Sequence, residues 1–213
     1  VILVSREAGG FKKCVDEAKK MAKEINGFLA NQFANRDNYL AHYETTGEEI
    51  IKQMTEKIDG FVSGVGTGGT LIGTGDRLKK KFSNIYITAI EPDKMPIISG
   101  GKIKGQHKIE GIGDDFIPDL VDKNKIDKVL LINDDDAINM SRKLARELGL
   151  GVGISSGANL LGSILLADEI KGNVVTIFAD DSKKYLSTDL FKDKNIVGNF
   201  ISDKVELINC EKV

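Results

Sequence analysis

The stretch Val62-Ser63-Gly64-Val65-Gly66-Thr67-Gly68-Gly69-Thr70 follows an apolar run that begins at Phe61 and precedes a helical pattern. The first backbone N–H groups of a helix have no partner inside the helix, and together with the helix dipole they form a site for an anion such as phosphate. Glycines let a ligand approach the main chain closely, and threonine hydroxyls add donors. We therefore predict a strand, a phosphate-binding turn and a helix here, with a tight turn that binds nothing as the alternative.

Strand-like and helix-like patterns alternate on both sides of this turn. The expected strands are residues 1–4, 61–65, 85–90, 129–132, a short one that ends at 154, and 174–179, and residues 28–30 are expected to be a short strand or an extended stretch. The expected helices are 14–25, 47–57, 70–82, 134–148 and 158–170, with a polar loop over 31–45 and a long loop over 91–119. Such alternation predicts an α/β fold, a three-layer sandwich whose mostly parallel sheet is covered by helices on both faces.

Composition argues against several classes of function. The 213 residues carry a net charge of -2, contain no Trp, and are 6% aromatic, which disfavours binding to nucleic acid. No apolar run approaches the roughly 18 residues of a membrane span and no signal sequence is recognised, so we expect a cytoplasmic protein without membrane contact. Two distant cysteines, Cys14 and Cys210, and two histidines, His42 and His107, make a disulfide or a metal site unexpected.

A dinucleotide site is a competing interpretation of the same glycines. Gly64, Gly66 and Gly69 match the spacing G-x-G-x-x-G. Glu91 stands at the end of the next expected strand, roughly 20 residues further on, where a ribose-binding acid would be expected. This pattern would indicate an NAD-dependent oxidoreductase. A non-catalytic protein that keeps the glycine turn only as structure is a third possibility.

Two further segments have the composition of a binding site. Residues 153–157 (GISSG) form a second junction before a helix, where a serine hydroxyl could donate to an uncharged ring nitrogen. Alternatively, Ser155 or Ser156 caps that helix, since serine is a favoured N-cap residue. Residues 107–118 could form a flexible wall over a pocket, or a plain surface loop.

Taken together, these segments resemble the cysteine synthase and cystathionine β-synthase family of fold-type II pyridoxal phosphate enzymes. The resemblance extends over residues 1–190. It is carried in order by 31–35 (NQFAN), 42–50 (HYETTGEEI), 64–70 (GVGTGGT), 91–92 (EP), 110–118 (EGIGDDFIP), 153–157 (GISSG) and 184–188 (KYLST). It implies a sheet like that of the tryptophan synthase β-subunit and pyridoxal 5'-phosphate as the cofactor.

The resemblance also implies roles for individual residues. Those expected to bind the cofactor phosphate are Gly66, Thr67, Gly68, Gly69 and Thr70, and Ser155 is expected to contact the pyridine nitrogen. Gln32 resembles the contact to the substrate carboxylate, and Gly111 and Gly113 resemble residues of the substrate entrance. A neutral hydroxyl at the ring nitrogen suits β-elimination better than transamination.

The implied reaction is β-replacement on O-acetylserine or serine by a sulfur nucleophile, in the synthesis of cysteine from serine. Residues 114–116 (DDF) are somewhat closer to the cystathionine-forming branch, so sulfide and homocysteine both remain candidate sulfur sources. The family also implies a homodimer and, for cysteine synthases, serine acetyltransferase as a partner.

One part of the family's machinery is not recognised in this sequence. No lysine stands in a motif like that of the family's Schiff-base lysine, and none is assigned a catalytic role. We therefore expect an N-terminally incomplete fold that is inactive alone, because an amine nucleophile is needed to hold the cofactor covalently. Residues 1–27 are expected to be a strand and helix left from an N-terminal domain, and residues 28–213 the domain that binds the cofactor phosphate.

Overall fold

A parallel sheet organises the part of the chain that this computed structural model describes, residues 1–5, 7–192 and 198–209. Its strands are β1 (Gly60–Gly64), β2 (Tyr86–Pro92), β3 (Lys128–Ile132) and β4 (Val174–Thr176), in the spatial order β3-β2-β1-β4. Each neighbouring pair is parallel, and Gly60 of β1 lies opposite both Tyr86 and Val174. The predicted parallel sheet is confirmed.

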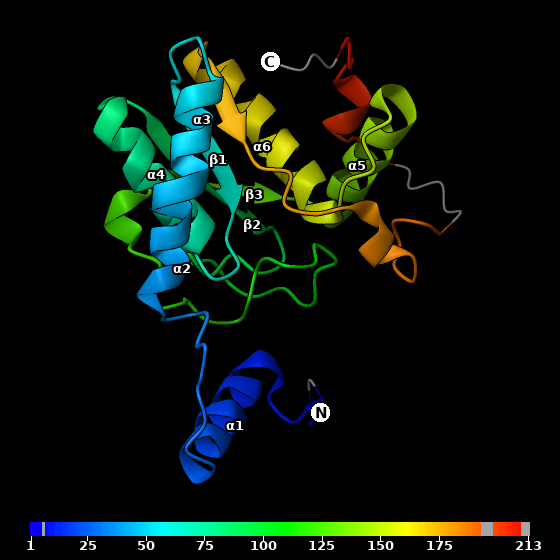
Figure 1. Cartoon of the computed structure of the whole chain (residues 1–213). Coiled ribbons are helices and arrows are strands. Elements are labelled where there is room, and N and C mark those ends of the chain that lie inside the picture. Colours follow the sequence, from blue (N-terminus) through cyan, green and yellow to red (C-terminus); the bar gives the residue numbers. More distant parts are fainter. Residues whose placement is uncertain (6, 193–197, 210–213) are drawn as a thin grey trace.

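Helices cover both faces of the sheet, which produces the predicted three layers (Figure 1). One face carries α4 (Gly69–Lys81), packed against α2 (Arg36–Ala41), the π-helix η1 (His42–Thr46) and α3 (Gly47–Gln53). The other carries α5 (Asp134–Leu148) and α6 (Ile154–Ile170), which pack on each other. Neighbouring residues of β1 point into different cores, Val62 toward α5 and α6 and Phe61 toward α3 and α4. This alternation explains why the central strands are apolar throughout.

Helix α5 begins and ends where the sequence predicted. The side chain of Asn133 accepts from the N–H groups of Asp135 and Asp136, and Gly149 ends the helix in the left-handed conformation. Helix α6 begins at Ile154, earlier than predicted, and is buried along most of its length. Short 3-10 turns occupy η2 (Lys123–Lys125), η3 (Ser182–Tyr185) and η4 (Ser202–Lys204).

Two expected strands are wrong, and of the two alternatives for residues 28–30 the strand is not formed. Residues 1–4 and 28–30 form no ladder, and Leu3 and Phe28 are about nine-tenths exposed, so these segments have no strand beside them to pair with. The short strand before residue 154 is reduced to one bridge between Val152 and Asp181. The strand expected over 174–179 stops at Thr176, and α3 ends at Gln53 rather than at 57.

The polar loop expected over 31–45 is also wrong, because most of it is helical. Asn35 caps α2 by accepting from the N–H of Asp37, and η1 continues directly from α2. The close approach to α4 stabilises this segment. Tyr39 donates its hydroxyl to Asp76 over 2.8 Å, and Gly73 leaves room for the Tyr39 carbonyl.

Helix α1 (Gly10–Glu24) differs from every other long helix. It has no buried residue and lies apart from the layers in Figure 1. Its predicted amphipathic pattern is present, but Phe11 and Met21 of its apolar face are exposed. A division between residues 27 and 28 into two domains stays a prediction.

Candidate functional site

A cavity of about 480 Å³ lies beside the turn that follows β1. Gly66 and Thr67 line it from that turn, Gln32 from the segment before α2, and Gly111 and Gly113 from the long loop after β2. The structure thus brings together five of the residues that the sequence marked for binding. Gly68, Gly69, Thr70 and Ser155 do not line this cavity.

The start of α4 has the form expected of an anion site. Its N-cap, Gly68, has a φ of +89° and provides no side chain to cap the helix, and the first turn contains no acidic residue. The N–H of Gly69 lies 3.3 Å from the Thr67 hydroxyl oxygen. The remaining donors of the first turn have no partner within the helix, so they are available to an anion.

Close packing requires the glycines of this turn. A Cβ on Gly66 would lie 2.5 Å from the carbonyl oxygen of Gly111, and one on Gly68 would lie 2.5 Å from a methyl group of Val121. A Cβ on Gly69 would collide with the Asn38 side chain. The turn is therefore held tightly between the cavity loop and α2, with its backbone close to the cavity.

Two residues that sequence reasoning missed hold the threonines of the turn. Asn38 donates to the Thr67 hydroxyl over 2.9 Å and to the Gln32 carbonyl over 2.8 Å. His42 lies between two hydroxyls, with Nε2 3.1 Å from Thr70 Oγ1 and Nδ1 3.0 Å from Thr46 Oγ1. Burial lowers the pKa of His42, which favours a neutral ring. Asn38 lies in the stretch interpreted as a loop, and no local pattern marks it as a site residue.

The second predicted junction, residues 153–157, lies at the start of α6. Gly153 is the N-cap and makes no side-chain bond, so the alternative in which Ser155 or Ser156 caps the helix is wrong. Ser155 is 6% exposed, and its hydroxyl makes no hydrogen bond within the described part of the chain. Ser156 is fully buried, with its oxygen unpartnered. Ser155 thus has a free donor in the first turn of α6.

Asn159, one turn after Ser155, joins α6 to the sheet. Its Oδ1 accepts from the N–H of Gly64 over 2.8 Å, and its Nδ2 donates to the carbonyl of Ile177 over 2.7 Å. Residues i and i+4 of a helix share a face, so Ser155 lies on the side of α6 that faces the end of β1. The starts of α4 and α6 therefore both lie at the carboxyl edge of the sheet, where ligands of open parallel sheets bind.

The loop opposite the glycine turn is held on both sides. His107 contacts the Gly113 carbonyl over 2.8 Å, and the N–H of Gly113 donates to the Val65 carbonyl over 3.0 Å. Phe116 packs edge-on against Phe33 with a centroid distance of 5.1 Å. This loop is a structured wall of the cavity.

Asp114 and Asp115 bring two carboxyl groups to this wall. Burial, and to a lesser extent the neighbouring Asp115, raises the pKa of Asp114, although His107 opposes the shift. Asp114 therefore holds a proton at higher pH than an exposed aspartate does. It can carry a proton within the cavity.

Glu91 is not placed to bind a ribose. It is 2% exposed, and its carboxylate accepts from the N–H groups of Ile98 and Ser99 at 2.7 and 3.0 Å. These bonds shape the loop after β2 and occupy the acid that the dinucleotide interpretation requires. That interpretation is therefore not favoured.

The described residues hold neither a membrane-spanning helix nor a metal-binding cluster. None of the helices there is long and apolar enough to cross a membrane. The described residues also contain no group of three or more His, Cys, Asp and Glu side chains that could hold a metal ion. Cys14 is exposed and free, whereas Cys210 lies outside the described residues.

Residues 1–180 match the family model described as pyridoxal-phosphate dependent enzyme. The chain belongs to this family. It is 42% identical over 184 residues to cysteine synthase B of Campylobacter jejuni, covering 85% of this chain and 61% of that protein. It is 43% identical over 183 residues to a cysteine synthase of Staphylococcus aureus, covering 84% and 59%. The chain thus spans about 60% of the length of these curated relatives.

Solved structures agree with the family in fold. A hydrogen sulfide-producing enzyme of Fusobacterium nucleatum superposes with a TM-score of 0.89 at 48% identity, covering 95% of this chain and 62% of that one. An O-acetylserine sulfhydrylase of Entamoeba histolytica gives a TM-score of 0.80 at 36% identity, covering 86% and 56%. The predicted fold class and the predicted family are confirmed.

The residues present fit the family's cofactor, pyridoxal phosphate. The uncapped start of α4 provides backbone donors for a phosphate, and Ser155 has a hydroxyl without a partner. The cavity between the glycine turn and the loop 107–115 is lined from both sides by backbone that lacks side-chain bulk, at Gly66 and Gly111.

Proposed function

We propose that the complete protein to which this chain belongs is a cysteine synthase, which replaces the β-substituent of O-acetylserine, or of serine, by a sulfur nucleophile. The observation that carries the proposal is the start of α4, which has backbone donors without a competing acid or side-chain cap and directly follows Gly66 and Thr67 of the cavity lining. Identities of 42–43% to cysteine synthases support it.

Residues at the starts of α4 and α6 bind different parts of the cofactor. The N–H groups and hydroxyls of residues 66–70 bind the cofactor phosphate, and the Ser155 hydroxyl donates to the ring nitrogen. When bound, pyridoxal phosphate supplies an electron sink for the bonds at the substrate's α and β carbons. The Gln32 side chain binds the substrate carboxylate, and Gly111 and Gly113 keep the entrance open.

The Schiff-base lysine belongs, in this proposal, to residues outside this chain. None of the residues that line the cavity in the described structure is a lysine. The 213 residues alone are therefore expected to be inactive, because no amine is placed to hold the cofactor. Assembly as a homodimer and binding of serine acetyltransferase are part of the same proposal.

Release of hydrogen sulfide from cysteine is a second candidate. The similarity to the sulfide-producing enzyme, at 48% identity, favours it. Asp114 also favours it, because a carboxyl group with a raised pKa beside the cavity can protonate a departing thiolate.

The complete protein with added pyridoxal phosphate tests both candidates. We expect a visible absorbance band from the bound cofactor and formation of cysteine from O-acetylserine and sulfide. Sulfide release from cysteine, measured in the same preparation, ranks the second candidate against the first. An absorbance spectrum that pyridoxal phosphate leaves unchanged, together with enhanced fluorescence of added NADH, would contradict the proposal and favour the dinucleotide interpretation.

A further inference from the structure

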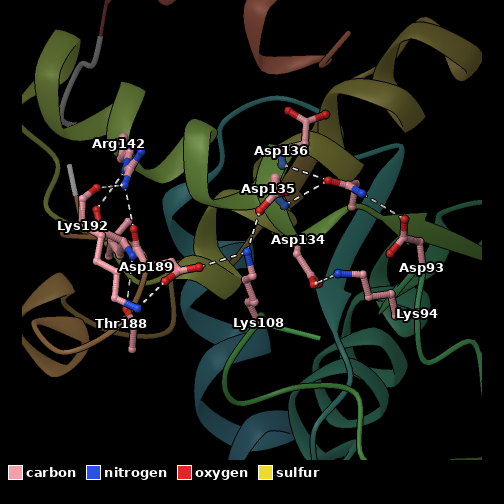
Figure 2. A network of polar contacts seen from close by, with 12 residues as sticks. Asp93, Lys94, Lys108, Asp134, Asp135, Asp136, Arg142, Thr188, Asp189 and Lys192 are labelled. Atoms are coloured by element: carbon pink, nitrogen blue, oxygen red, sulfur yellow. Dashed lines mark hydrogen bonds and ion pairs between the residues drawn. The ribbon is translucent and has the colours of Figure 1, made fainter. Parts of the chain in front are cut away.

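The first turn of α5 contacts three segments of the chain through consecutive acids, and Figure 2 shows two of these contacts, those with Lys94 and Lys108. Asp134 binds Lys94, from the loop after β2, over 2.8 Å. Asp135 binds Lys108, from the cavity loop, over 3.0 Å. Asp136 accepts from the N–H groups of Ile201 and Ser202 in the C-terminal region at 2.9 and 3.0 Å. Helix α5 thus connects the cavity loops to the end of the chain.

Lys108 lies between two carboxylates. Its Nζ is 3.0 Å from Asp135 and 3.0 Å from Asp189, and Figure 2 shows it between the two. Hydrogen bonds to Asp189, then to Asp135, raise the pKa of Lys108, so the lysine stays charged. We call this arrangement the Lys108 bridge.

Asp189 stands on a firmly held segment. Arg142 of α5 donates Nε to the Leu190 carbonyl over 2.9 Å and Nη2 to the Asp189 and Lys192 carbonyls at 2.7 and 2.5 Å. The Leu190 side chain is buried in the core beneath α5 and α6. The Asp189 carboxylate is therefore a fixed point and not a mobile surface acid.

The residues on either side of Lys108 belong to the wall of the cavity or to the core. His107, before Lys108, lines the cavity, and Ile109, after it, is fully buried. Ile109 belongs to the core cluster that also contains residues of α5 and Leu190, and Lys108 adds ion pairs from the same run to Asp135 and Asp189. Whatever holds Lys108 also limits how far the backbone of residues 107–115 can move.

We propose that Asp189 and Lys108 are positioning residues, which fix the cavity loop 107–115 against α5 and thereby set the affinity of the site for its amino-acid substrate. The claim about the loop rests on geometry alone. The claim about substrate affinity rests on the proposed function.

Hydrogen exchange of the complete protein tests the first claim. Asp189→Asn and Lys108→Met should each speed the exchange of amides in residues 107–115 by about three- to tenfold, the range expected for a partly exposed ion pair. Lys108→Arg, which can still bridge two carboxylates, should leave exchange unchanged. Lys192→Met is the matched control, because it removes a different partner of the same carboxylate. Lys192 Nζ lies 2.7 Å from Asp189 Oδ1.

Steady-state kinetics tests the second claim. In Asp189→Asn, we expect KM for O-acetylserine to rise about three- to tenfold while kcat changes less than about twofold, since the loop contributes to binding rather than to bond breaking. Lys192→Met should leave both constants unchanged. Equal exchange in all variants, or faster exchange throughout the molecule, would overturn the proposal, as would a fall in kcat at constant KM. If loop exchange responds but no cofactor band or cysteine forms, the proposed function fails and the Lys108 bridge stands.

Discussion

Helices α4 and α5 both begin after a strand of the same parallel sheet, yet their first turns are opposite in chemistry. The start of α4 has a glycine N-cap, no side-chain cap and no acid. The start of α5 has the Asn133 cap and three consecutive aspartates. Both turns expose the same kind of backbone donors. In α5 these donors and the positive end of the helix dipole are satisfied by the protein itself, whereas in α4 they are left for a ligand.

The difference shows how a sequence separates a binding turn from a structural one. A helix start with Asn or Asp contributes stability, since cap and dipole interactions are made on folding. A glycine start gives up that contribution and also requires backbone conformations that other residues avoid.

Gly68→Leu should have the largest effect, because it closes the open turn of α4. A side chain would collide with Val121 and would be strained at a φ of +89°. We expect the affinity of the complete protein for pyridoxal phosphate to fall at least about 100-fold, which corresponds to about 2.7 kcal/mol. Absorbance titration measures it.

Gly100→Ala is the control for Gly68→Leu. Gly100 also has a positive φ, +76°, but nothing lies within 4 Å of its Cβ position. This variant should lose about 1–2 kcal/mol of stability and no cofactor affinity. If both variants bind the cofactor as the parent does, the turn of α4 is not the phosphate site.

Asp136→Ala should damage the structural turn. The buried carboxylate accepts two backbone N–H groups, which would be left without a partner. We expect the free energy of unfolding, from urea titration, to fall by about 2–4 kcal/mol. The exposed Asp203→Ala in the same region should cost less than about 0.5 kcal/mol. An equal loss in both variants would contradict a special role for Asp136.

Asn133→Ala should have a smaller effect on the same turn. Its side chain accepts from two N–H groups of α5, and loss of such a cap costs about 1 kcal/mol. Asn133→Ser keeps a capping oxygen and should recover most of the stability in urea unfolding. Cofactor affinity at α4 should be the same in both variants, and a parallel loss of affinity would show that the two turns are coupled.

His42 should produce the smallest effect, a pH dependence of stability. Burial lowers the pKa of His42 in the folded protein, so the unfolded chain takes up the proton at higher pH. Stability from this group is fully present above about pH 6.5 and falls as the pH decreases toward the folded pKa, by at most about 1.4 kcal/mol per pH unit.

Urea unfolding between pH 5 and 8 compares the parent with His42→Gln, which lacks this dependence. NMR titration of the ring provides a direct check. A His42 ring that titrates at or above its ordinary pKa would disprove the prediction.

Local signals predicted the sheet and both turns. Glycine content marked the start of α4, and Asn133 and Gly149 marked the ends of α5, because caps act within a few residues. The segments that failed depend on distant partners. The helix of α2 is stabilised where Gly73 of α4 admits the Tyr39 carbonyl, and no pattern within residues 31–45 contains that information.

The candidate site, like the fold, was predicted only where local patterns or the family resemblance identify its residues. Five of the residues chosen from the sequence line one cavity: Gly66 and Thr67 belong to a glycine-rich turn that a local pattern identifies, and the family resemblance added Gln32, Gly111 and Gly113. Asn38, His42 and the Lys108 bridge were missed as parts of it, because each is defined by contacts between residues far apart in the chain. The roles assigned to Ser155 and Gln32 stay predictions.

Asn159 connects the start of α6 to β1, the strand that leads into α4. The Asn159 amide lies between Gly64 and Ile177, beyond the point where β4 pairs with β1. It hydrogen-bonds to the backbone of both residues, in place of a hydrogen bond between the two strands. Because this one side chain fastens α6 to the strand that leads into α4, Ser155 and the glycine turn cannot drift apart independently. The spacing between them is therefore set by the fold, and in the proposed function it has to match the separation of the phosphate and the ring nitrogen of the cofactor.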